Sequence, residues 1–125
     1  MGQYVDVSPS SISSVNYAIS DHGASGRNAD NTYSQSYTCP AGKMLLAFTF
    51  SYCTESDGRG TVPNLSVTNL SELRSAARQN WQVYQNYCVW KVYYCDNTKG
   101  NSAKTCVIKQ NATWLETTTT FWIVL

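Results

Sequence analysis

Apolar and polar residues alternate along several short segments of the chain, with the period of two that is typical of β-strands. In residues 44–51 this alternation produces one strongly apolar face, formed by Met44, Leu46, Phe48 and Phe50. Residues 88–95 alternate in the same way, through Trp90, Val92 and Tyr94. Residues 117–120 are four consecutive threonines, whose branched side chains also favour extended backbone.

The C-terminal segment 121–125 differs because it is apolar on both faces. Phe121, Ile123 and Leu125 share one face, and Trp122 and Val124 share the other. A strand of this kind is central in its sheet, covered by a partner subunit, or both. A small sandwich has only one interior, so the second apolar face predicts a homo-oligomer.

Turn residues separate these strands. Asp57-Gly58 and Lys99-Gly100-Asn101 predict turns, and Asp21–Asn31 predicts a loop. Leu70–Asn80 has helical spacing of apolar residues, with Asn69 as a candidate N-cap. The expected fold is all-β: one small antiparallel β-sandwich or barrel-like domain over residues 1–125, with a short helix near 70–80.

The composition excludes several classes of function. Charged residues are only 14% of the 125 residues, the net charge is +1, and Ser, Thr, Asn and Gln supply 35%. Binding to nucleic acid needs a basic excess, which is missing. No apolar run approaches the roughly 18 residues that cross a bilayer, so no membrane insertion is expected. Met1–Ser20 has no pattern of a signal peptide.

Five cysteines, at positions 39, 53, 88, 95 and 106, favour an oxidised environment, and therefore an extracellular location or a cell or virion surface. The spacing contains no CxxC pair, so neither a metal site nor any other cofactor is predicted. Residues 94–107 resemble a hairpin with turn residues in its middle, so a disulfide between Cys95 and Cys106 is the favoured pair. Cys88 and Cys95 are seven residues apart and are expected on opposite strand faces.

The residues needed for catalysis are scarce. His22 is the only histidine, the acidic residues are scattered, and no GxSxG or glycine-rich phosphate loop occurs. We therefore expect no enzyme, although a cysteine nucleophile using His22 stays open. Aromatic residues reach 13% and are densest over residues 81–94, where one strand face is too small to hold them all. Exposed Tyr and Trp among amides and hydroxyls suit the recognition of sugars or proteins.

Three segments carry a resemblance to a known family. Residues 112–124 (ATWLETTTTFWIV) resemble the closing strands of H-type lectins, which have a Thr-Trp pair and a final strand with Trp-Ile. Residues 26–32 (GRNADNT) are similar to the loop before the first core strand of those lectins, and residues 39–46 (CPAGKMLL) are similar to that strand. Leu115, the segment 67–100 and the five cysteines depart from the family pattern.

The resemblance implies a six-stranded sandwich that forms trimers and binds N-acetylgalactosamine-type sugars between subunits. Trp114 would stack on the sugar, and the polar contacts would come from Arg27, Asn28, Asp30 and Glu116. The sequence therefore predicts an extracellular, non-catalytic binding module for a glycan or glycoprotein. The alternative is a self-assembling structural protein, such as a virion, tail or filament subunit.

Overall fold

A computed structural model describes residues 16–22, 30–53, 64–80, 86–113 and 115–125. These residues form eight β-strands, and no helix is found among them: β1 (Asn16–His22), β2 (Asp30–Cys39), β3 (Met44–Cys53), β4 (Asn64–Thr68), β5 (Ser71–Asn80), β6 (Asn86–Asp96), β7 (Lys104–Thr113) and β8 (Leu115–Val124). The all-β prediction is confirmed. Within this part of the chain no helix is long and apolar enough to cross a membrane.

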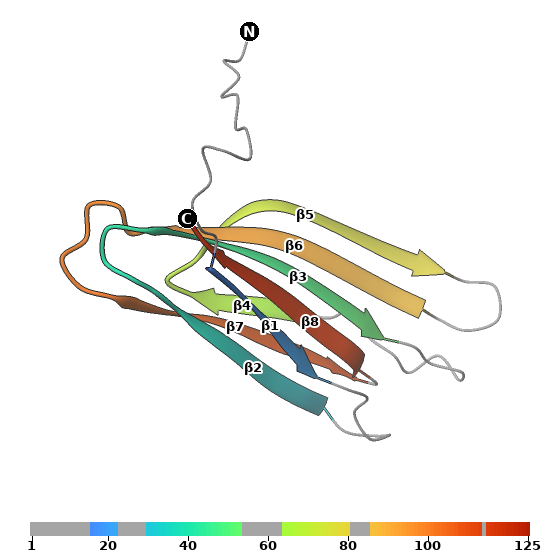
Figure 1. Cartoon of the computed structure of the whole chain (residues 1–125). Helices are drawn as coiled ribbons and strands as arrows, with labels where there is room; N and C mark the ends of the chain where they lie inside the picture. Colours follow the sequence, from blue (N-terminus) through green and yellow to red (C-terminus); the bar gives the residue numbers. More distant parts are fainter. Residues whose placement is uncertain (1–15, 23–29, 54–63, 81–85, 114) are drawn as a thin grey trace, which may run out of the picture.

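The strands form two antiparallel sheets that lie face to face (Figure 1). One sheet has the order β1-β8-β3-β6-β5, and the other has the order β2-β7-β4. Strand β8 lies between β1 and β3, so of the two expectations for the two-faced C-terminal strand, the central position is confirmed and cover by a partner subunit stays a prediction. The eight strands exceed the six that the lectin resemblance implies.

The apolar core occupies one half of the space between the sheets. The five-stranded sheet contributes Leu45, Ala47, Tyr93, Cys95, Trp122 and Val124, and the three-stranded sheet contributes Cys39, Cys106 and Ile108. Trp122 is fully buried, its ring stacks on Tyr37 with the centroids 5.9 Å apart, and its indole N–H donates to the Ser20 hydroxyl over 3.1 Å. Burial of such a side chain supplies much of the hydrophobic stabilisation of a small domain.

The other half of the interior is polar. The Gln110 amide donates to the Thr49 hydroxyl over 2.7 Å, the Thr49 and Thr120 hydroxyl oxygens lie 3.0 Å apart, and Thr120 donates to the Gln35 side-chain oxygen. All four residues are buried, and Gln35 also donates to the backbone oxygen of Ser20. These bonds satisfy groups whose burial without partners would be costly.

The helix predicted over Leu70–Asn80 is wrong, because Ser71–Asn80 form β5 and all of these residues except Leu73 pair with β6. Asn69, the candidate N-cap, adopts a left-handed conformation with φ 58° in the turn before β5 and donates to the Thr105 backbone oxygen over 2.9 Å. A short helix is marginal alone, whereas β6 offers a complete row of backbone partners. A register shift between Glu72 and Arg74 leaves Leu73 half exposed.

The hairpin predicted over residues 94–107 is also wrong, because β6 and β7 belong to different sheets. The turn predicted at Lys99–Asn101 does lie between them. Asn97 fixes this crossing: its side-chain amide donates to the backbone oxygens of Cys39, Pro40 and Ser102 over 2.9–3.3 Å. Gly100 is required there, since a Cβ would lie 1.9 Å from the Asn97 side-chain oxygen.

Two further expectations are only partly tested. The predicted loop Asp21–Asn31 is shorter than expected, because β1 extends through His22 and β2 begins at Asp30. The Asp57-Gly58 turn lies outside the described residues.

Candidate functional site

Two of the predicted sugar-binding residues, Asp30 and Glu116, lie at one end of the sandwich, where β1 and β7 finish and β2 and β8 begin (Figure 1). Asp30 is the first residue of β2 and pairs with Thr113, the residue before Trp114. Glu116 is the second residue of β8. Arg27, Asn28 and Trp114 themselves lie outside the described residues. The backbone register thus brings together two of the segments that the resemblance singles out.

The outer side of the five-stranded sheet carries the largest group of exposed apolar side chains in the described part of the chain. Phe48 is flanked in register by Val92 and Phe121, Phe121 by Ile19, and Phe50 by Trp90. We call this surface the apolar face and define it by Ile19, Leu46, Phe48, Phe50, Trp90, Val92, Phe121 and Ile123. Ile19 is 62% exposed, and Phe48, Phe50 and Trp90 are 40–43% exposed.

The apolar face is as large as the largest apolar patches on monomeric proteins, which are often functional. Its exposed apolar area is on the order of 500 Å², at the upper end of the roughly 300–600 Å² of the largest patch on a typical monomer. Five strands of about ten residues, spaced by about 4.8 Å, present a face of roughly 800 Å². A standard protein–protein interface buries about the same area on each partner. Alternation grouped residues within β3, within β6 and within β8, but it could not show that these groups form one face or that they point outward, and it did not identify Ile19.

The outer side of the three-stranded sheet has the opposite chemistry. Exposed hydroxyl and ammonium groups cover it, on the strands β2, β4 and β7: Thr32, Ser34, Ser36, Thr38, Ser66, Thr105 and Lys109. We call this surface the hydroxyl face. A water-facing sheet normally shows this composition.

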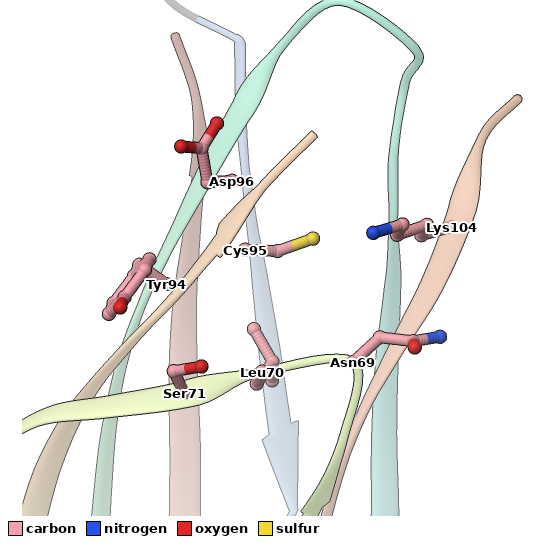
Figure 2. A pocket seen from close by; sticks show the side chains of 7 residues that line it. All are labelled: Asn69, Leu70, Ser71, Tyr94, Cys95, Asp96 and Lys104. Atoms are coloured by element: carbon pink, nitrogen blue, oxygen red, sulfur yellow. The ribbon is translucent and has the colours of Figure 1, made fainter. Parts of the chain in front are cut away.

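A pocket of about 320 Å³ opens at the end of the sandwich opposite the predicted sugar site. Figure 2 shows its lining, in which the Cys95 sulfur and the Lys104 ammonium group point toward each other; the lining residues are Asn69, Leu70, Ser71, Tyr94, Cys95, Asp96 and Lys104. The Thr98 hydroxyl donates to Asp96 over 2.6 Å and holds the pKa of that carboxyl below its usual value. At neutral pH the pocket therefore carries one negative and one positive charge.

Three thiols meet behind this pocket. Cys39, Cys95 and Cys106 are at most 5% exposed and belong to one core cluster. Burial, followed by the Cys95 side chain, raises the pKa of Cys39 to about 11 and that of Cys106 to about 12. Cys95 and Cys106 are thiols in this structure, so the disulfide between them stays a prediction. No sequence pattern indicated the third member, Cys39, since strand parity does not reveal contacts between sheets.

The expected opposite orientation of Cys88 and Cys95 is confirmed: Cys95 faces the core, whereas Cys88 shares the register face of Trp90. The aromatic side chains of the same strand also lie on both faces, since Tyr93 is buried and Trp90 is exposed. Among the described residues, no group of three or more His, Cys, Asp and Glu side chains is arranged to hold a metal ion.

Comparisons with known proteins add no relative. No protein-family model, curated protein or solved structure matches the chain significantly.

Proposed function

We propose that this protein is an extracellular, non-catalytic binding module that works as a dimer, held together through the apolar face. The observation that carries the proposal is that the five-stranded sheet turns polar side chains inward and aromatic side chains outward. Thr49 and Thr120 point into the sandwich, whereas their neighbours Phe48 and Phe121 point out. A sheet whose aromatic side chains face water gains stability when a second surface covers them.

The partner that fits this surface is a second copy of the chain. The centre of the apolar face carries no charged side chain, and the exposed Arg74 lies only at its β5 edge, in register with Val92. A partner surface of the same chemistry is available on every other copy. Pairing of one face with itself across a two-fold axis is complete at two subunits, whereas a filament needs two different complementary patches. The geometry therefore favours a closed dimer over an open structural assembly.

The test is the mass of the protein in solution. The wild-type chain, with a mass of 13.9 kDa, is expected to sediment as a dimer at micromolar concentration. Phe48→Glu together with Phe121→Glu buries two carboxylates in the interface, so the dissociation constant should rise at least about 100-fold.

The matched control is Ser34→Glu together with Ser36→Glu, which adds the same charge to the hydroxyl face. We expect this control to dimerise like the wild type. A wild-type protein that stays monomeric at about 100 μM, or a control that dissociates as strongly as the Phe variant, would overturn the proposal. Filaments or shells in negative-stain micrographs would support the structural-protein alternative instead.

The candidate ligand is a glycan, bound at the end of the sandwich where Asp30 pairs with Thr113. This register supports the lectin-like assignment because it pairs Asp30–Thr32, the end of the segment 26–32, with Asn111–Thr113, and Thr113 is the threonine of the Thr-Trp pair. Two copies of such a site in a dimer would strengthen binding to a multivalent glycan surface without any new contact. The binding residues proposed are Trp114, Arg27, Asn28, Asp30 and Glu116.

A glycan array that includes N-acetylgalactosamine tests the ligand. Trp114→Ala should abolish binding, and Arg27→Ala should weaken it by about 1.5–3 kcal/mol. The melting temperature of each variant must be measured alongside. If Trp114→Ala melts normally and still binds, or if the wild type binds no glycan, the glycan assignment fails while the dimer proposal stands or falls on its own test.

A further inference from the structure

The three buried thiols are distributed unequally between the sheets. Cys95 lies on β6 of the five-stranded sheet, and Cys39 and Cys106 lie on the neighbouring strands β2 and β7 of the other sheet. Cys39 pairs with Lys104 and Cys106 pairs with Tyr37, so the two cysteines are diagonal neighbours. Diagonal neighbours in a sheet are about 7–8 Å apart between Cα atoms, beyond the usual span of a disulfide.

Cys95 is the common neighbour of the other two. Its thiol acts on the other two, raising the pKa of both Cys39 and Cys106, and all three side chains belong to one buried cluster. The Cys39 sulfur also lies 3.9 Å from the Cys95 backbone oxygen and 3.5 Å from that of Lys43. The Cys106 sulfur lies 3.6 Å from the Asn69 backbone oxygen. Cys95 can therefore reach either partner, whereas the two partners are poorly placed for each other.

We propose that Cys39, Cys95 and Cys106 form a redox site in which Cys95 makes one disulfide between the sheets, with either Cys106 or Cys39, and the third thiol exchanges between the two arrangements. The pocket of Figure 2 is the entrance, because the Cys95 sulfur points into it and the Lys104 ammonium faces that sulfur.

The oxidant is a low-molecular-weight disulfide, RSSR. The Cys95 thiolate attacks one sulfur of RSSR, an S–S bond forms to Cys95, and one RS⁻ leaves and takes up the proton lost by Cys95. The Cys106 or Cys39 thiolate then attacks the Cys95 sulfur and releases the second RS⁻, which takes up the proton of that cysteine. Two cysteine thiols are thus oxidised to one disulfide while RSSR is reduced to two RSH.

Exchange consumes no further oxidant. When Cys95 is bonded to Cys106, the Cys39 thiolate attacks the Cys95 sulfur and Cys106 becomes a thiol again; the reverse step is equivalent. Since burial raises the pKa of Cys39 and Cys106 well above neutrality, few thiolates are present at pH 7 and exchange is slow there. Exchange should accelerate about tenfold for each pH unit up to about pH 10.

The experiment uses the full chain with Cys53→Ala and Cys88→Ala, which leaves only the three cysteines. The folded protein is incubated with oxidised glutathione, quenched in acid, alkylated and mapped by peptide mass spectrometry. We expect one thiol per chain and two linked peptide pairs, Cys39–Cys95 and Cys95–Cys106, whose ratio re-equilibrates faster at higher pH.

Single variants in this background provide the matched controls. Cys39→Ala should leave only the Cys95–Cys106 disulfide, Cys106→Ala only Cys39–Cys95, and Cys95→Ala two thiols with no disulfide. Near-UV circular dichroism confirms folding before oxidation; if the background does not fold, the same substitutions are made in the five-cysteine chain. A Cys39–Cys106 disulfide in the Cys95→Ala variant, only one linked pair in the background protein, or no disulfide at all in the folded protein would overturn the proposal.

Discussion

The two outer surfaces of the sandwich have the same backbone geometry and opposite chemistry. The hydroxyl face presents Ser34, Ser36 and their neighbours to water, as expected for the solvent side of an antiparallel sheet. The apolar face presents Phe48, Phe50 and Trp90, each at least 40% exposed. The fold alone therefore does not decide whether the outer side of a sheet is polar or apolar. The same alternation of side chains that fills the core thus leaves aromatic side chains on the outer side of the five-stranded sheet, and the proposed dimer rests on this difference.

The sharpest test of this comparison uses two neighbours on β8 that face opposite ways. Trp122→Ala removes a fully buried ring and should lower the free energy of unfolding by about 3–5 kcal/mol at every protein concentration. Phe121→Ala should cost more stability at concentrations at which the dimer forms than at those at which the chain is monomeric, because binding stabilises the folded state by mass action. Denaturant unfolding at two protein concentrations separates the two. A concentration-independent loss at Phe121 would place that side chain's energy within the single chain.

A smaller loss of stability is expected when a buried hydroxyl group is removed from the inner side of the five-stranded sheet, opposite the apolar face. Thr120→Val leaves the Gln35 side-chain oxygen without its donor and should cost about 1–3 kcal/mol. The isosteric control is Thr38→Val on the hydroxyl face, where a change within about 0.5 kcal/mol is expected. Chemical denaturation measures both. Equal changes in the free energy of unfolding at the two positions would mean that the buried hydrogen bonds of Thr120 do not stabilise the fold.

The buried side of β6 should be sensitive to alkaline pH. Burial, followed by the nearby Glu72 carboxylate, raises the pKa of Tyr93 to about 12 from its ordinary value of 10.0. The folded state thus holds the phenol proton more tightly than the unfolded state, so its contribution is complete below pH 10 and is lost between pH 10 and 12. Tyr93→Phe should flatten this part of the stability profile. A profile that is unchanged in the variant would contradict the assignment to Tyr93.

The smallest expected effect is that of salt on the dimer. The centre of the apolar face is uncharged, so screening has little to act on. We expect the dissociation constant to change less than about threefold between 50 and 500 mM sodium chloride, measured by sedimentation. A steep weakening with salt would instead indicate an interface built on Arg74 and other charged groups outside the apolar face.

The alternation of apolar and polar residues was enough to predict three of the eight described strands. Period-two alternation predicted β3, β6 and β8, and the apolar residues on both sides of β8 correctly placed it inside a sheet. It failed for β5, where Leu70, Leu73 and Ala77 happen to have helical spacing. Local spacing there was overridden by the backbone hydrogen bonds that β6 offers, which no local pattern encodes.

Only the tertiary structure decided which side of each strand is inside. Alternation assigns the residues of a strand to two faces but does not show which face is buried. In β3 the more apolar face is the outer one. The same holds for the cysteines: parity separated Cys88 from Cys95, but the crossing of the chain between sheets at Asn97 brought Cys95 to both Cys39 and Cys106. Such contacts depend on how the two sheets stack, which is set by the packing of the whole chain.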